Sequence, residues 1–168
     1  QLAIYKRLLA NLKVDPALAE RTANAVASAQ VVQPSPEPPD PTAPKPVAGG
    51  AAPVKLTQLD DLLSIPGYTV EVVDKLRDFV IVLPEQGTQV NVNTAAPEVL
   101  AAVIEDFSLA EANALVARRK TAAWRGLNYF TDDLHGKKAV AAAVGVQSSY
   151  FLVRSRVQLD RAALNSEA

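Results

Sequence analysis

Apolar side chains recur at helical spacing in the first residues of this chain. The apolar positions lie three or four residues apart, at Tyr5, Leu8, Leu9 and Leu12. Charged and amide side chains take most of the positions between them, so the spacing predicts an amphipathic helix over residues 2–13. Asp15 and Pro16 then favour the cap and first turn of a second, alanine-rich helix that continues to about residue 29. Residues 1–30 are therefore expected to be helical.

Proline dominates the next part of the chain. Eight prolines and the pair Gly49-Gly50 fall between residues 34 and 53. This composition supplies few backbone donors and little apolar surface to bury, which predicts an exposed linker over residues 31–53. A proline-rich ligand for a groove on another protein is the alternative.

Residues 54–78 again carry leucine and valine at helical spacing, and they predict two short helices around the turn Ile65-Pro66-Gly67. Alternating residues on both sides of a Pro-Glu-Gln-Gly turn predict a β-hairpin over residues 79–93. The remaining predicted segments are helices at about 96–106, 108–120 and 131–143 within residues 94–148, a closing strand at 149–160, and a tail at 161–168. The closing strand can join the distant hairpin only across an insertion of helices, so the expected fold class is α+β with a small antiparallel sheet.

The second strand of this hairpin leads straight into a helix, and its polar residues form the most specific pattern in the chain. Apolar and polar residues alternate over 89–93, which indicates a half-buried strand. Asn93 or Thr94 can accept a hydrogen bond from a free N–H group of the next helix, and Pro97 suits a first-turn position. Together with Asn91, these residues are predicted to form a structural motif that begins the helix.

Composition excludes several kinds of chemistry. The 168 residues contain no cysteine, which rules out disulfides, thiolate nucleophiles and cysteine-ligated metal sites. Charges nearly balance, with 17 lysines and arginines against 18 aspartates and glutamates, so no broad positive field is available to collect nucleic acid. The longest apolar run, residues 139–146, is far shorter than the roughly 20 residues that a membrane span requires. The chain is expected to be a soluble fragment.

Candidate catalytic groups are few. His135, the single histidine, has no nucleophile elbow or phosphate loop near it and is expected to be an exposed polar residue. The pairs Asp60-Asp61 and Asp132-Asp133 could serve acid–base chemistry in a hydrolase. Both pairs follow a threonine near an expected helix start, where capping and dipole compensation account for them better. An enzyme is therefore not expected, and no catalytic, cofactor-binding or metal-binding residue is assigned.

Several segments in order resemble the minor pseudopilin K family of type II secretion systems over roughly residues 56–159. They are Leu56 to Gly67, the strand Val80 to Pro84, the element Asn91 to Leu100, a helix ending in Arg118-Arg119, Tyr129 to Leu134, and a last strand from Tyr150. The resemblance implies a pseudopilin fold, in which an amphipathic N-terminal helix and a small antiparallel sheet carry a large inserted helical domain of helix-hairpin-helix or SAM-like type. Residues 1–30 are then expected to be the helical stem region.

The same resemblance implies a function, partners and a location. Family members are non-enzymatic components at the tip of the periplasmic pseudopilus, and they support export of folded proteins across the outer membrane. They assemble with minor pseudopilins I and J, with H as a further candidate. A hydrophobic segment preceding the region seen here anchors them in the inner membrane of a Gram-negative bacterium, so this chain is expected in the periplasm.

Two further expectations follow from the resemblance. Tyr5 and Leu8 are expected to face partners, and Leu9 and Leu12 to face the sheet of the same domain, which makes these four residues the partner-binding candidates.

Some family members bind calcium. No segment of this chain has the density of oxygen ligands that calcium requires, so no cofactor is expected.

A helix-hairpin-helix module that binds nucleic acid, as in small competence proteins, is the alternative. Such modules hold phosphate with backbone N–H groups of a glycine-containing turn. The corresponding turn, residues 105–108, has no glycine and carries Glu105 and Asp106, whose charges oppose phosphate. The notable basic cluster is Arg118 to Lys120 with Arg125, and cations at a helix C-terminus complement the helix dipole. No nucleic-acid partner is expected.

Overall fold

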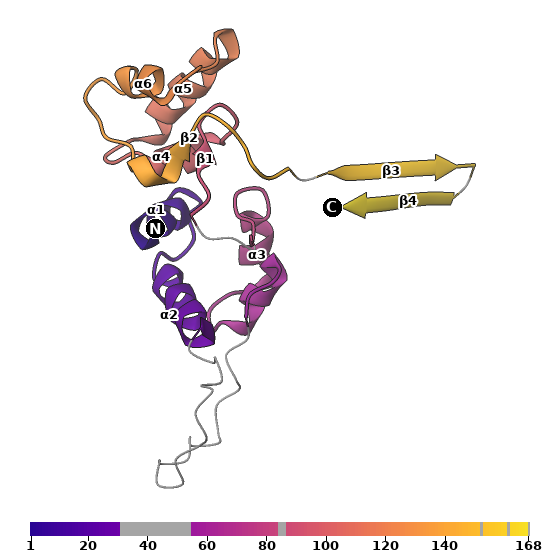
Figure 1. Cartoon of the computed structure of the whole chain (residues 1–168). Coiled ribbons are helices and arrows are strands. Elements are labelled where there is room, and N and C mark those ends of the chain that lie inside the picture. Colours follow the sequence, from indigo (N-terminus) through magenta and orange to yellow (C-terminus); the bar gives the residue numbers. More distant parts are fainter. Residues whose placement is uncertain (31–54, 84–86, 152, 161, 168) are drawn as a thin grey trace, which may run out of the picture.

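The computed structural model describes residues 1–30, 55–83, 87–151, 153–160 and 162–167 (Figure 1). The expected linker at 31–53 lies outside the described residues. In chain order the elements are α1 (Leu2–Asn11), α2 (Leu18–Gln30), the 3-10 helix η1 (Leu59–Ser64), α3 (Val70–Leu76), β1 (Val90–Asn91), α4 (Pro97–Val103), α5 (Leu109–Thr121), α6 (Leu127–Asp132), the 3-10 helix η2 (Ala141–Ala143), β2 (Val144–Gly145), β3 (Arg154–Leu159) and β4 (Ala162–Glu167). Helices with small sheets confirm the α+β class.

The first body consists of residues 1–30 and 55–83, and it is helical. Its buried core contains Leu9, Val14, Leu18, Leu62, Ile65, Tyr68, Val73 and Leu76. The predicted pair of short helices is confirmed as η1 and α3, joined by a turn in which Gly67 adopts a φ of +100° that favours glycine. Thr69 begins α3 by accepting a hydrogen bond from the Val72 N–H at 3.4 Å.

The second body consists of residues 87–151. Its buried core contains Val92, Leu100, Val103, Ile104, Ala112, Leu115, Trp124, Phe130, Leu134 and Val144. Helices α4 and α5 occupy two of the predicted helical segments, and they pack against each other. Ser108 and Glu111 form a capping box at the start of α5, so a local sequence signal fixes where this helix begins.

Helix α1 joins the two bodies. Leu9 lies fully buried in the first core, while Ile4, one turn earlier, packs against the second core. Arg7 donates from Nε to the Ala102 carbonyl oxygen at 2.7 Å, and Asn11 donates from Nδ2 to the Glu98 carbonyl oxygen at 3.0 Å. The helix is therefore a central element lying between α2 and α4 (Figure 1). That residues 1–30 are the helical stem region of a pseudopilin stays a prediction.

The predicted hairpin at 79–93 is wrong. Residues 79–83 form no strand, because the Phe79 and Val80 N–H groups both bond the Leu76 carbonyl oxygen at 2.9 Å and hold the chain against the end of α3. Val90 and Asn91 pair instead with Val144 and Gly145, in parallel. Alternation correctly indicated a strand here, but it carries no information about which distant segment becomes the partner.

The predicted helix at 131–143 is also wrong, because α6 ends at Asp132. His135 and Gly136 follow with φ values of +50° and +91°, and this left-handed backbone stops the helix. Beyond the turn, the Val140 N–H donates to the Val103 carbonyl oxygen at 3.0 Å, and residue 139 bridges to residue 104. A short apolar run fits either a helix or a buried strand, and here it is divided among a bridge residue, the short 3-10 helix η2 and strand β2.

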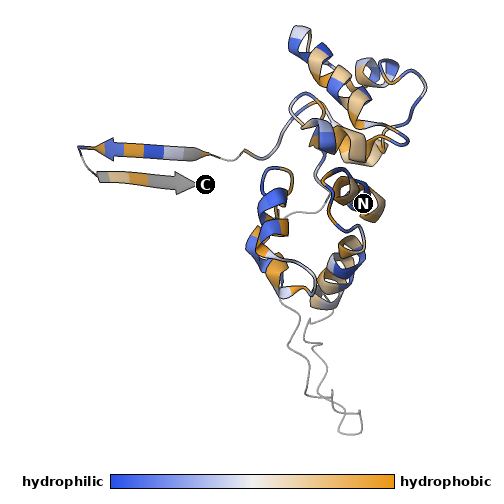
Figure 2. Cartoon of the chain, turned by 180° about the vertical axis from the view of Figure 1, so that it is seen from behind, coloured by the Kyte–Doolittle hydropathy of each residue, from blue (hydrophilic) through white to orange (hydrophobic). Residues whose placement is uncertain are grey.

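The closing strand is present as β3, but its partner differs from the prediction. It pairs antiparallel with β4, which occupies the segment predicted as a tail, and the two strands form a sheet separate from β1 and β2. The hairpin projects away from the two bodies (Figure 1). Its exposed apolar side chains include Val157, Leu159 and Leu164, and apolar and polar segments alternate along it in Figure 2.

Replacing Leu9 with alanine tests the central position of α1. Because the side chain is fully buried, the substitution should lower the free energy of unfolding by about 2–5 kcal/mol. Urea unfolding followed by helical circular dichroism measures the change. Leu2→Ala is the matched control, since Leu2 lies in the same helix with 40% of its surface exposed and should lose less than about 1 kcal/mol. Equal losses in the two variants would contradict the assigned packing.

Candidate functional site

Asn91 closes the turn between β1 and α4. Its side-chain Oδ1 accepts from the Asn93 N–H at 2.9 Å, and its carbonyl oxygen accepts from the N–H groups of Thr94 at 3.1 Å and Ala95 at 2.9 Å. Its Nδ2 donates to the Ser148 hydroxyl at 2.9 Å. Asn91 thus fixes the turn locally and also ties it to the segment that follows β2.

Asn93 holds a loop that is 31 residues away in the sequence. Its Oδ1 accepts from the Trp124 N–H at 2.9 Å, and its Nδ2 donates to the Trp124 carbonyl oxygen at 2.9 Å and to the Val146 carbonyl oxygen at 3.3 Å. One amide side chain therefore satisfies both backbone groups of a buried residue, as a neighbouring strand would. We call this arrangement the Asn93 clamp.

The predicted capping role of Asn93 and Thr94 is wrong. The residue that precedes α4 is Ala96, and no side chain caps its first turn. Thr94 turns back to donate to the Asn91 carbonyl oxygen at 3.4 Å. Pro97 does occupy the first helical position, where its missing N–H costs no hydrogen bond. The motif is structural, as predicted, but its main contact is with the Trp124 loop rather than with the helix.

Trp124 lies at the centre of the second body with 4% of its surface exposed. Its ring packs edge-on against Phe130, with centroids 5.1 Å apart, and its Nε1 donates to Asp133 Oδ2 at 2.6 Å. The same carboxylate pairs with Arg118. Sequence reasoning missed this contact, and the available signal was that the chain has a single tryptophan. A buried indole N–H needs an acceptor, and a nearby carboxylate can supply one.

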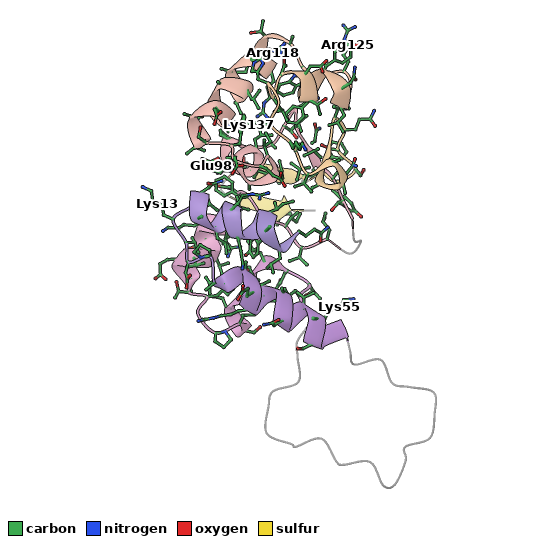
Figure 3. All side chains as sticks on the ribbon, turned by 90° about the vertical axis from the view of Figure 1, so that its left-hand side faces the viewer. Lys13, Lys55, Glu98, Arg118, Arg125 and Lys137 are labelled. Carbon is green, nitrogen blue, oxygen red and sulfur yellow. The ribbon has the colours of Figure 1, made fainter. Side chains whose placement is uncertain are left out.

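The basic cluster divides into two parts. Arg118 pairs with Asp133, and Arg119 donates from Nη1 to the Val92 carbonyl oxygen at 2.8 Å. Partial burial lowers the pKa of Arg119. Lys120 and Arg125 are exposed, and neither makes a hydrogen bond or ion pair with another described residue. Figure 3 shows Arg118 and Arg125 at the end of the molecule far from Lys13 and Lys55.

The four partner-binding candidates on α1 are used within this chain. Leu8 and Leu9 are buried, and Leu12 packs on the first core. The Tyr5 hydroxyl lies 2.9 Å from that of Tyr68, and burial is the main cause that raises the Tyr5 pKa. The predicted division of this face is wrong, because Tyr5 and Leu8 are covered by the chain itself and the surface that covers the face is helical, not a sheet.

The paired aspartates have structural contacts. Asp60 forms an ion pair with Arg77 at 2.6 Å, and Asp61 Oδ2 accepts from the N–H groups of Thr57 at 2.7 Å and Gln58 at 3.0 Å, which lower its pKa. The second pair lies at the end of α6 and not at a helix start, so that expectation is wrong. Asp133 of this pair accepts the hydrogen bond from the Trp124 indole, while Asp132 is exposed.

The described ranges of the chain contain neither a cluster of metal ligands nor a helix suited to span a membrane. Within them, no group of three histidine, cysteine, aspartate or glutamate residues could hold a metal ion, and His135 is exposed. No helix in those ranges has the length and apolar content to cross a membrane.

The turn at residues 105–108 is closed by charged side chains. Glu111 accepts from the Ser108 N–H at 2.8 Å and the Ser108 hydroxyl at 2.6 Å. Lys137 Nζ lies 2.6 Å from the other carboxylate oxygen of Glu111 and donates to the Asp106 carbonyl oxygen at 2.6 Å. The Lys137 hydrogen bond, followed by those from Ser108, lowers the pKa of Glu111 to about 2. The ammonium group of Lys137 at this turn is therefore already bonded within the chain.

Sequence models of one family, described as type II secretion system (T2SS) protein K, match residues 1–85 and residues 90–152. The chain belongs to the type II secretion system protein K family. The resemblance to the minor pseudopilin K family is thereby confirmed. The two matches coincide closely with the two bodies, each of which has its own hydrophobic core.

Two relatives carry the same description. Type II secretion system protein K of Pectobacterium carotovorum subsp. carotovorum is 24% identical over 122 residues, which cover 68% of this chain and 37% of the relative. The protein K of Dickeya chrysanthemi is 26% identical over 114 residues, which cover 63% of this chain and 32% of the relative. The chain thus aligns with about a third of the length of these protein K relatives.

Replacing Asn93 with alanine tests the Asn93 clamp. The substitution leaves the buried backbone N–H and carbonyl of Trp124 without their partners, so unfolding free energy should fall by about 1–3 kcal/mol. Urea unfolding followed by Trp124 fluorescence measures it. Asn113→Ala is the control, because exposed Asn113 bonds only a carbonyl of its own helix and should change stability by less than about 0.5 kcal/mol. A clamp variant as stable as this control would refute the proposed role.

The lowered Glu111 pKa predicts acid sensitivity of the α5 start. The carboxyl titrates near 4.5 when unfolded and near 2 when folded, so its contribution to stability is complete above about pH 4.5 and is lost as the pH falls through about 2. The melting temperature of Glu111→Gln should therefore lie below that of the wild type at neutral pH, and the gap should close toward pH 2. Glu105→Gln, whose side chain makes no bond to a described residue, should show no such gap. A gap that is independent of pH would contradict the assignment.

Proposed function

We propose that this protein is the periplasmic part of a minor pseudopilin that has no catalytic reaction of its own. In this proposal it assembles with minor pseudopilins I and J, and with H beside them, at the tip of the pseudopilus. The complex supports export of folded proteins across the outer membrane. Its anchor in the inner membrane is a hydrophobic segment outside this sequence.

The observation that carries the proposal is the agreement between family and architecture. The family matches cover residues 1–85 and 90–152, and each match corresponds to a body with its own core. Helix α1 belongs to the first match but contacts α4 of the second. The resemblance therefore extends over the packed unit and is not confined to one short motif, which favours a shared role over chance similarity.

The contacts of the candidate catalytic residues agree with a structural role. Asp60 forms an ion pair with Arg77, and Asp61 accepts a hydrogen bond from the Gln58 N–H before η1. Asp133 accepts a hydrogen bond from Trp124 and pairs with Arg118. A general acid or base needs an accessible carboxyl beside a site for substrate. These carboxyls are instead bonded to their own chain, which favours an assembly component over a hydrolase.

The exposed apolar residues of the β3–β4 hairpin also support a role in which this protein assembles with another polypeptide. A two-stranded hairpin by itself is marginally stable in water. Its apolar side chains are largely exposed, with 74% of Leu159 and 67% of Leu164 accessible. Burying such side chains is worth roughly 1.5–3 kcal/mol each, so a surface of this kind is stabilised when a further segment covers it.

The nucleic-acid alternative has less support. The turn at residues 105–108 has Asp106 at its centre, and Lys137 is committed to Glu111 and to a backbone carbonyl there. At the other turn, Arg21 lies against Gly67 and donates to the Pro66 carbonyl oxygen at 2.8 Å. Side chains of the chain itself therefore cover the backbone that a phosphate would have to approach closely.

Co-assembly tests the proposal. The full-length protein, mixed with minor pseudopilins I and J, should elute with them as one complex in size-exclusion chromatography. In a strain lacking the gene, export of a folded secretion substrate should fall strongly, and expression of the full-length protein should restore it. Independent elution of the three proteins, together with unchanged export in the deletion strain, would refute the proposal.

A further inference from the structure

The end of the second body carries exposed cations and an exposed tyrosine. Three exposed residues lie there: Lys120 in the last turn of α5, Arg125 just before α6, and Tyr129 in α6, and we call them the 120–129 surface. The sequence from 116 to 133 has four cations and two carboxylates, while the whole chain has a net charge of −1. Of the four cations, Arg118 and Arg119 have partners inside the chain, and the other two have none among the described residues. Residues 116–133 therefore have an excess of two positive charges, and Arg118 and Arg125 lie at one end of the protein (Figure 3).

Compensation of helix dipoles explains Lys120 but not Arg125. Lys120 lies in the last turn of α5, where a cation is favourable. Arg125 immediately precedes Gly126, which is the N-cap residue of α6, and the first turn of α6 has no acidic residue. A cation at that end of a helix is unfavourable rather than stabilising. No contact with a described residue therefore shows Arg125 to stabilise the fold.

Hydrogen bonds to Trp124, the residue before Arg125, fix the position of the loop that carries this arginine. The Asn93 clamp bonds both backbone groups of Trp124, and Asp133 bonds the indole. Next to it, the Tyr129 ring lies 3.6 Å from the position that a Cβ on Gly126 would occupy, and 58% of the tyrosine surface is exposed. A preorganised surface loses less conformational entropy on binding than a mobile one.

We propose that the 120–129 surface binds an acidic segment of a neighbouring minor pseudopilin. Arginine pairs with carboxylates through two parallel hydrogen bonds, lysine adds a point charge, and tyrosine supplies a large contact surface with little rotamer freedom. Arginine and tyrosine are also enriched among the residues that dominate protein interfaces. The acidic partner supplies carboxylates to Lys120 and Arg125, which pair with no described carboxylate of the chain itself.

A protein partner is favoured over nucleic acid at this surface. Nucleic-acid grooves usually combine a continuous basic track with several stacking platforms. Here two cations have no partner among the described residues and one tyrosine is exposed, while Asp132 on the same helix is also exposed. That amount of charge suits a short acidic segment better than a phosphate backbone.

The inference rests on the proposed function, and a charge-reversal experiment tests it. Lys120→Glu combined with Arg125→Glu in the full-length protein should weaken the complex with minor pseudopilins I and J by about tenfold or more, because the acidic segment would meet like charges. Binding of the wild type should also weaken as salt is raised. Lys13→Glu with Lys55→Glu makes the same change in net charge on exposed lysines of the first body and should leave binding unchanged. Tyr129→Ser should weaken binding without changing its salt dependence.

Each outcome is decisive because folding is checked in the same samples. Trp124 fluorescence and the melting temperature should match the wild type in all variants. If the wild type forms no complex, the proposed function fails. If the wild type assembles and the charge-reversed protein binds equally well, only this inference fails. Micromolar, salt-dependent binding of duplex DNA that is lost in K120E/R125E would replace the acidic protein partner with nucleic acid.

Discussion

The two-sided burial of α1 is the constraint on which the rest of the architecture depends. Leu9 completes the first core, and Ile4 packs on the second. On the same helix, the side chains of Arg7 and Asn11 donate to backbone carbonyls of α4. An amphipathic helix usually has one buried stripe and one solvated face. Here the face that carries polar residues is itself in contact with the second body, so this short helix packs against both cores.

The Asn93 clamp has the same role within the second body. The loop before α6 has to bury Trp124 without a strand or helix to satisfy its backbone groups, and one side-chain amide provides both bonds. Asp133 then satisfies the indole and draws Arg118 onto the same carboxylate. Because buried polar groups are costly when they have no partner, these contacts are mutually dependent.

Elements with a local cause could be predicted from the sequence, and pairings over long distances could not. The spacing of the leucines in α1 and the Pro66-Gly67 turn each act within a few residues, and each correctly indicated a helix or turn. Asn93 looked like a helix cap because asparagine favours caps, but its partner is 31 residues away and no local pattern identifies it. The segment after Gly136 was assigned to a helix because apolar residues without clear periodicity fit either structure.

The same distinction explains why residues chosen as partner-binding candidates turned out to be internal. An apolar face on a helix shows that something covers it, but it does not show whether the cover is the same chain or another. Tyr5 and Leu8 are covered by the chain itself, as are Leu9 and Leu12. Exposed side chains without internal partners are more informative about assembly, because the fold gives no other reason for their position. By that criterion the apolar side of the β3–β4 hairpin and the cations beside Trp124 are better candidates for contact with other subunits than any face of α1.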